Sequence, residues 1–235
     1  MDILRNLDFS TALHQLTPQL LQGGWIALQA TIGGFLLAII LGVFIAAGRL
    51  AKSKLLRGIL LAFLEIIRGT PLLVQLVYMF YVVPLLISIV IQLWVSGYQY
   101  HINPLAAGIL GLGINYGCYL SEVVRASILA VNKGQTEAAL ALGYTHRQAL
   151  WSIVIPQAIR NSIPVFGNYL IMMIKDTSLL AFITVNELLL RTQAYASQTF
   201  LTIESYTLLA IAYLIISLPL SQIVRLTEKR LSKHA

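Results

Sequence analysis

The feature that most constrains this chain is a set of long stretches without a charged side chain. Residues 24–48, 69–121 and 205–224 contain no Lys, Arg, Asp or Glu. A helix that crosses the hydrocarbon core needs about 20 mostly apolar residues, because only helices and closed barrels satisfy every backbone amide there. Charged residues make up 11% of the chain, against roughly a quarter in soluble domains. The pattern predicts an all-α membrane protein.

We expect a single transmembrane domain over residues 1–235 with five spans. The expected spans are residues 24–48, 58–83, 105–131, 163–188 and 205–224. Residues 69–121 are too many for one helix, so we place a break at Pro84 and the polar run 96–104, and interpret residues 85–95 as a segment at the membrane surface. In a competing register the second span covers residues 72–95, which leaves Arg68 outside the membrane.

The distribution of cations predicts the orientation, because short cytoplasmic loops collect Lys and Arg. With five spans, twelve of the 16 Lys and Arg residues fall on one side, which places the N-terminus outside and the C-terminus in the cytoplasm. The net charge of +7 is spread over three segments beside the membrane, which favours contact with anionic lipid over nucleic acid. These cations are Arg49, Lys52, Lys54, Arg57, Arg125, Lys133, Arg147, Arg160, Arg225, Lys229, Arg230 and Lys233.

The sequence offers no residues for common cofactor or metal chemistry. Cys118 is the only cysteine, and the four histidines have no partners at metal-ligand spacing. No phosphate-binding loop sequence occurs, so we expect no ATP site in this chain. We also find no pairing of nucleophile and base, and therefore predict that the protein is not an enzyme.

The connection between the third and fourth spans, residues 132–159, is unusually long. Gly143 is expected to end a first short helix, and Thr145 with Gln148 forms a capping box that starts a second. We expect Pro156 to stop that second helix, since proline disfavours helical geometry in the residue before it. Two interpretations remain at this point: an elbow that docks into another protein, or an amphipathic helix on lipid headgroups.

The same loop resembles the EAA loop of permeases in ATP-binding-cassette (ABC) importers. The matching positions are Glu137, Ala138, Ala139, Gly143, Ile153 and Pro156, while Ile155 replaces the usual leucine. Residues 68–72, 120–125 and 175–179 resemble motifs of the polar amino-acid uptake subfamily, the histidine and glutamine permease-like proteins. This resemblance covers most of the chain.

The resemblance implies a type I importer fold in the bacterial cytoplasmic (inner) membrane. The EAA loop would be the coupling helix that fits into a dimer of separate ATPase subunits, which would bind ATP and Mg. The implied partners are a second permease copy or a paralogue, and an amino-acid-binding protein outside the membrane. The expected substrate is a polar amino acid.

Ionisable residues within a span are costly and often line a transport path, so Lys175 and Asp176 are candidate substrate residues. Asp176 would bind the substrate ammonium, with Thr177 and Ser178 near the carboxylate. Asn115 and Tyr119 share a face of the third span, and line the path or pack among apolar side chains. The alternative for Lys175 and Asp176 is a structural polar pair.

Arg68, Glu122 and Arg125 are expected near the cytoplasmic ends of their spans, where they would form a gating or structural ion pair. An alternative function is secondary transport driven by an ion gradient, with Lys175 and Asp176 as the coupling pair. Such transporters usually contain internal repeats and more spans, and we find no internal repeat in this sequence. Only the importer hypothesis needs the elbow loop.

Overall fold

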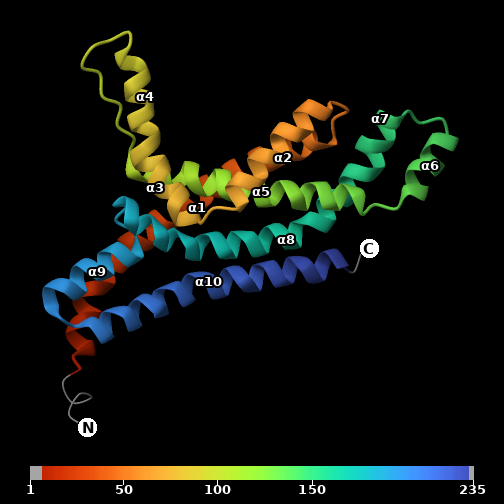
Figure 1. Cartoon of the computed structure of the whole chain (residues 1–235). Helices are drawn as coiled ribbons and strands as arrows, with labels where there is room; N and C mark the ends of the chain where they lie inside the picture. Colours follow the sequence, from red (N-terminus) through yellow and green to blue (C-terminus); the bar gives the residue numbers. More distant parts are fainter. Residues whose placement is uncertain (1–6, 233–235) are drawn as a thin grey trace.

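A computed structural model describes residues 7–232 of the chain, which contain helices and connections but no β-strand (Figure 1). The longest helices are α1 (Phe9–Leu50), α5 (Pro104–Leu129), α8 (Ile155–Asp176) and α10 (Thr202–Ser232). α8 packs between α5 and α10, and α1 packs along α5. The all-helical prediction is therefore confirmed. Lys233, assigned above to the cytoplasmic side, lies outside the described residues.

Small residues allow α1 and α5 to approach closely. A Cβ atom added at Gly117 on α5 would lie 3.4 Å from the Ala38 carbonyl oxygen of α1. A Cβ atom at Gly42 on α1 would lie 3.2 Å from the Ser121 amide nitrogen. Close backbone approach through small residues is typical of helix pairs in membranes, where apolar burial alone does not drive association.

The second expected span differs from the structure. A single helix over residues 58–83 is absent: α2 (Lys54–Arg68) ends before a break, and α3 (Leu72–Val77) begins after it. Pro71 accounts for the break, because it has no backbone N–H and restricts the preceding residue. Residues 72–92 then form the helix that is long and apolar enough to cross a membrane. This arrangement agrees with the competing register.

Two prolines expected to interrupt helices lie inside continuous helical segments. Pro84 is the second residue of α4 (Val83–Gln92), which directly follows a π-helix, Tyr78–Val82, so residues 85–92 are no separate segment. Pro156 is likewise the second residue of α8, which directly follows the π-helix Leu150–Val154. In each case the residue before proline bonds five residues back, which widens the turn and removes the usual clash with the proline ring. The prediction that Pro156 stops a helix was wrong.

The remaining spans differ from expectation mainly at their ends. α1 begins at Phe9 rather than residue 24, and α10 continues to Ser232 rather than 224. α8 passes into a 3₁₀-helix, Thr177–Ile183, which ends at Thr184 with φ 63°, short of the expected residue 188. α9 (Leu188–Thr199) was not predicted; buried Glu187 caps its first turn.

Four helical segments in the described chain are long and apolar enough to cross a membrane: 9–50, 72–92, 146–183 and 202–230. α5 is not one of these four segments, although its 26 residues are enough for a span. α5 contributes more residues to the main apolar core than any other element. Its residues Leu112, Tyr116 and Leu120 join Ala38 of α1 and Met173 of α8 in the main apolar core.

Candidate functional site

A cavity of about 470 Å³ lies where the α2–α3 break meets α5 and α8. α5 supplies polar and aromatic side chains from consecutive turns, α8 supplies its last two turns, and the break supplies backbone and small side chains. The lining residues are Thr70, Pro71, Leu72, Asn115, Tyr116, Tyr119, Asn168, Tyr169, Met172 and Asp176. Discontinuous helices commonly form substrate sites in transporters, because their broken backbone can face a polar cavity.

Asp176 is the last residue of α8 and carries the one carboxylate of the cavity lining. The Tyr116 hydroxyl donates a hydrogen bond of 2.7 Å to Asp176 Oδ2, which fixes the carboxylate against α5. Among the described residues, no Lys or Arg lines the cavity. Asp176 therefore keeps hydrogen-bonding capacity toward the cavity, and no Lys or Arg in the lining neutralises its negative charge.

Three tyrosine rings surround the approach to this carboxylate. The Tyr116 and Tyr169 ring centroids lie 6.1 Å apart, with planes nearly perpendicular at 89°. The Tyr119 and Tyr169 centroids lie 6.0 Å apart. Aromatic faces attract cations, so the rings and Asp176 together form an environment suited to an organic ammonium group.

The structure brings together only some of the residues predicted for the substrate. Asp176, Asn115 and Tyr119 line one cavity, whereas Lys175, Thr177 and Ser178 do not. Lys175 is exposed because adjacent helical residues point about 100° apart. Thr177 is buried, and its hydroxyl donates to the Ile174 carbonyl oxygen at 2.7 Å.

Sequence reasoning missed Tyr116 and Tyr169 as lining residues. The helical spacing of each tyrosine to a predicted site residue could have identified both. Tyr116 lies three residues before Tyr119, and Tyr169 lies seven residues before Asp176, so each pair shares a helix face. Thr70 and Pro71 could not be found this way, because a helix break brings them to the cavity.

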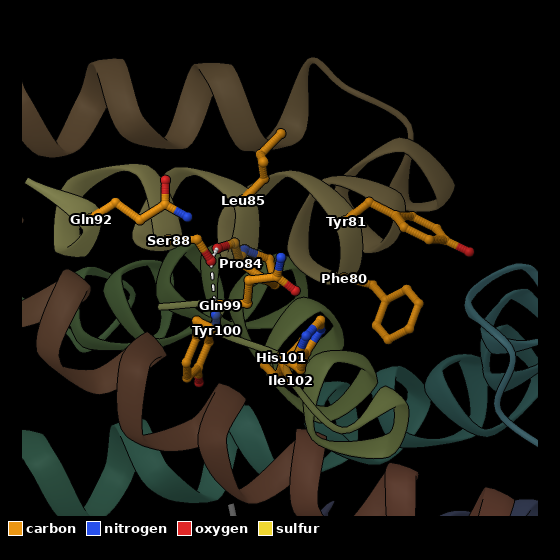
Figure 2. Close-up of a pocket in the computed structure, with 10 residues that line it drawn as sticks. All are labelled: Phe80, Tyr81, Pro84, Leu85, Ser88, Gln92, Gln99, Tyr100, His101 and Ile102. Atoms are coloured by element: carbon orange, nitrogen blue, oxygen red, sulfur yellow. Dashed lines mark hydrogen bonds between the residues drawn. The ribbon is translucent and has the colours of Figure 1, made fainter. Parts of the chain in front are cut away.

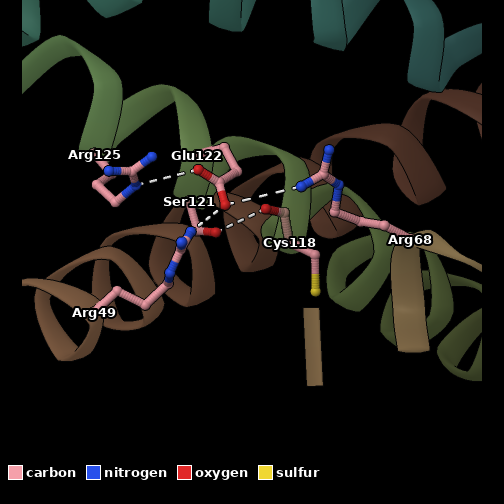
Figure 3. Close-up of polar contacts among 6 residues, drawn as sticks. All are labelled: Arg49, Arg68, Cys118, Ser121, Glu122 and Arg125. Atoms are coloured by element: carbon pink, nitrogen blue, oxygen red, sulfur yellow. Dashed lines mark hydrogen bonds and ion pairs between the residues drawn. The ribbon is translucent and has the colours of Figure 1, made fainter. Parts of the chain in front are cut away.

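A second polar group lies about one helical turn beyond Tyr119 on α5, where Glu122 gathers three guanidinium groups (Figure 3). Arg125 Nε lies 3.2 Å from Glu122 Oε2, and Arg68 Nη1 lies 3.8 Å from Oε1. Arg49 of α1 also donates to Oε1 and was not anticipated. The cluster therefore joins α1, the end of α2, and α5.

Arg68 connects this ion cluster to the cavity. Its guanidinium carbon lies 5.5 Å from the centroid of the Tyr119 ring, and Tyr119 lines the cavity. The guanidinium is thus shared between a carboxylate and an aromatic face, both favourable for a cation. Movement of α2 would disturb both contacts together.

Glu122→Gln is expected to lower the free energy of unfolding by about 2 kcal/mol, because three guanidinium groups lose their shared anion. This expected loss of stability is smaller than that for a fully buried ion pair, since the Glu122 side chain is 28% exposed. Thermal unfolding in detergent measures the effect. Glu65→Gln, an exposed carboxylate on α2, is the matched control. Equal melting temperatures for the two variants would contradict a stabilising role.

A smaller cavity of about 390 Å³ lies between α4 and residues 99–102 (Figure 2). Ser88 Oγ accepts a 2.8 Å hydrogen bond from the Tyr100 backbone N–H and so holds this segment against the helix. Gln92 Nε2 donates to the Tyr98 carbonyl oxygen at 3.0 Å. No Asp, Glu, Lys or Arg occurs among the residues that line it.

The predicted elbow between α5 and α8 is present as a local structure. α6 (Lys133–Ala141) ends before Gly143, whose φ of 88° is left-handed, and the capping box of Thr145 and Gln148 starts α7 (His146–Ala149). Ala139 is buried and Ile153 half-buried. The exposed positions of the motif are Glu137, Ala138, Gly143 and Pro156.

Comparison with known proteins decides the family. Residues 38–233 match the family described as "Binding-protein-dependent transport system inner membrane component". The chain belongs to this family. It is 36% identical to the L-cystine transport system permease protein TcyB of Bacillus subtilis, over 92% of this chain and 88% of TcyB. It is 31% identical to the glutamine transport system permease protein GlnP of Escherichia coli, over 94% and 96% respectively.

Solved structures agree with this assignment. An amino acid ABC transporter crystallised with histidines contains a chain that matches 96% of the permease with a TM-score of 0.85 and 32% identity, and 99% of that chain is covered. The MetNI methionine transporter has a TM-score of 0.64 at 21% identity and supports the fold alone. The permease is thus a transport protein of type I ABC importer fold, as predicted. In its described part, no group of three or more His, Cys, Asp or Glu residues could hold a metal ion.

Proposed function

We propose that this permease moves a polar amino acid across the cytoplasmic membrane by alternating access, driven by separate ATPase subunits. The observation that carries the proposal is the cavity in which Asp176 and three tyrosines meet a broken helix. The names of TcyB, GlnP and the histidine-containing transporter support the same class of substrate.

Asp176 is proposed to bind the ammonium group that amino acids share. A charge-assisted hydrogen bond to this carboxylate is stronger than a neutral one, and the rings of Tyr116 and Tyr169 would add cation–π attraction. The substrate carboxylate requires donors instead. Asn115 and Asn168 carry side-chain amides in the lining, and the first-turn amides of α3 begin at the cavity wall with no side-chain cap.

The elbow is proposed as the contact with the ATPase. Its surface includes large apolar side chains that water would not favour: Leu142 is 80% exposed and Trp151 is 63% exposed. Exposed apolar patches rimmed by polar residues mark protein contacts. Because the elbow continues directly into α8, displacement of α7 would be transmitted toward Asp176, while ATP and Mg would remain on the partner.

The remaining assembly follows from the family. We propose five spans, α1, residues 72–92, α5, α8 and α10, with the N-terminus outside and the C-terminus in the cytoplasm. A second copy or a paralogue would complete the translocation path, and an external amino-acid-binding protein would deliver substrate. The cluster of Arg49, Arg68, Glu122 and Arg125 would act as a cytoplasmic gate beside Tyr119.

Co-purification tests the assembly. The tagged chain, expressed with its neighbouring genes in a bacterial host, is expected to bring down an ATPase subunit at one copy per permease. Leu142→Ser with Trp151→Ser should reduce this yield, because both apolar side chains leave the elbow surface. Leu93→Ser with Trp94→Ser at the end of α4, which are 79% and 85% exposed, is the control. Purification of the chain without any ATPase would contradict the proposal.

A further inference from the structure

Gln75 lies on the first helical turn after the α2–α3 break, and its side chain folds back onto the break. Its Nε2 atom lies 2.6 Å from the Ile67 carbonyl oxygen and 3.0 Å from the Thr70 carbonyl oxygen. It also lies 2.9 Å from Thr70 Oγ1. One amide group on α3 therefore contacts both the last turn of α2 and the break itself.

The chemistry of the break explains these contacts. In a continuous helix the Ile67 carbonyl would accept a hydrogen bond from the backbone of residue 71, four positions later. That residue is Pro71, which has no N–H. The Gln75 side chain supplies a donor in its place at 2.6 Å, alongside the Thr70 hydroxyl, which donates to the same carbonyl at 3.3 Å. An unpaired carbonyl is costly away from water, so this bond favours the observed shape of the break.

The other end of the same amide is bonded to α5. Gln75 Oε1 accepts a 3.0 Å hydrogen bond from Asn115 Nδ2. Asn115 is 6% exposed and lines the cavity, as do Thr70, Pro71 and Leu72 of the break. Gln75 itself is not among the lining residues. It therefore links two walls of the cavity without lining the cavity itself.

We propose that Gln75 is a positioning residue for the substrate cavity. Its amide holds the wall formed by Thr70, Pro71 and Leu72 at a fixed distance from Asn115 on α5, and so sets the affinity for the amino acid. The inference rests on the proposed function, since it assumes that the cavity binds substrate. Gln75 would affect substrate binding only through the residues that it holds in place.

Equilibrium binding tests the inference. The permease with its co-purified ATPase is placed in lipid nanodiscs and titrated with each radiolabelled common amino acid and with cystine, with and without Gln75→Met. The variant keeps the length of the side chain but removes its hydrogen bonds. We expect the dissociation constant of the tightest ligand to rise about tenfold. Gln92→Met, at the end of the same continuous helix (Figure 2), removes a hydrogen bond to the Tyr98 carbonyl oxygen of the following loop and should leave the dissociation constant unchanged.

A double variant separates positioning from a purely structural role. If the link to Asn115 carries the effect, Gln75→Met combined with Asn115→Leu should bind no more than about twofold more weakly than the poorer single variant. Multiplied losses would overturn the inference. A lowered melting temperature with an unchanged dissociation constant would also overturn it.

A second variant, Gln75→Glu, and the wild-type complex complete the test. If Gln75→Met fails to insert, Gln75→Glu is measured instead, because it keeps the acceptor for Asn115 but cannot donate to the Ile67 and Thr70 carbonyls. It should also weaken binding. If the wild-type complex binds no amino acid, the substrate cavity is wrong and the inference falls with it; wild-type binding with unaltered variants refutes the role of Gln75 alone.

Discussion

Asp176→Asn is expected to lower amino-acid uptake by about 10- to 100-fold, since a hydrogen bond to a charged group contributes about 1.5–3 kcal/mol. The amide retains an oxygen that accepts from the Tyr116 hydroxyl, so the local packing is preserved while the negative charge is lost. The measurement is the initial rate of uptake in cells at matched amounts of inserted protein.

Lys175→Gln is the matched control for this charge. Lys175 precedes Asp176 on the same helix but is exposed and does not line the cavity. Its neutralisation should leave uptake within about twofold of the wild type, because no contact to the cavity is removed. If the Lys175 variant loses uptake and the Asp176 variant does not, the ammonium site has been assigned to the wrong residue.

Gly143→Val is expected to abolish uptake while the protein still inserts. Gly143 has φ 88°, and a Cβ there would meet no atom within 4 Å. The penalty therefore comes from the backbone, because a β-branched residue strongly disfavours the left-handed region. The elbow would relax into another shape, and contact with the ATPase would be lost. Membrane quantity, uptake and recovery of the ATPase are measured together.

Two substitutions make this test specific. Gly143→Asn should recover much of the uptake, since asparagine tolerates positive φ better than other non-glycine residues. Gly58→Val on α2 also adds a side chain into open space, but at a helical position. It should leave uptake near the wild-type level. Full uptake by Gly143→Val would show that coupling does not depend on this corner.

The helical class and the elbow could be read from the sequence because their causes are local. Charge-free stretches indicate directly that the chain lies in a membrane. The left-handed turn at Gly143 and the capping box at Thr145 depend only on a few neighbouring residues. The second span could not be placed by charge alone, because residues 69–121 contain no charge that marks its ends. Pro71, rather than Pro84, interrupts the helix.

Pro84 and Pro156 show why two other helix interruptions were predicted wrongly. Pro84 and Pro156 were expected to interrupt helices, but a π-turn before each one keeps the chain helical. Such a turn is selected by packing on both sides of the proline, which one segment of sequence does not contain. Arg49 illustrates the same limit for the polar groups, since it reaches Glu122 from 73 positions away.

Uptake into proteoliposomes tests the central claim most directly. The permease and its ATPase are reconstituted with the external binding protein, ATP is enclosed on the ATPase side, and radiolabelled amino acids are supplied outside. We predict accumulation of a polar amino acid that requires ATP hydrolysis and persists when ionophores collapse all ion gradients. Uptake that needs an ion gradient and proceeds without ATP or the ATPase would contradict the account and identify a secondary transporter.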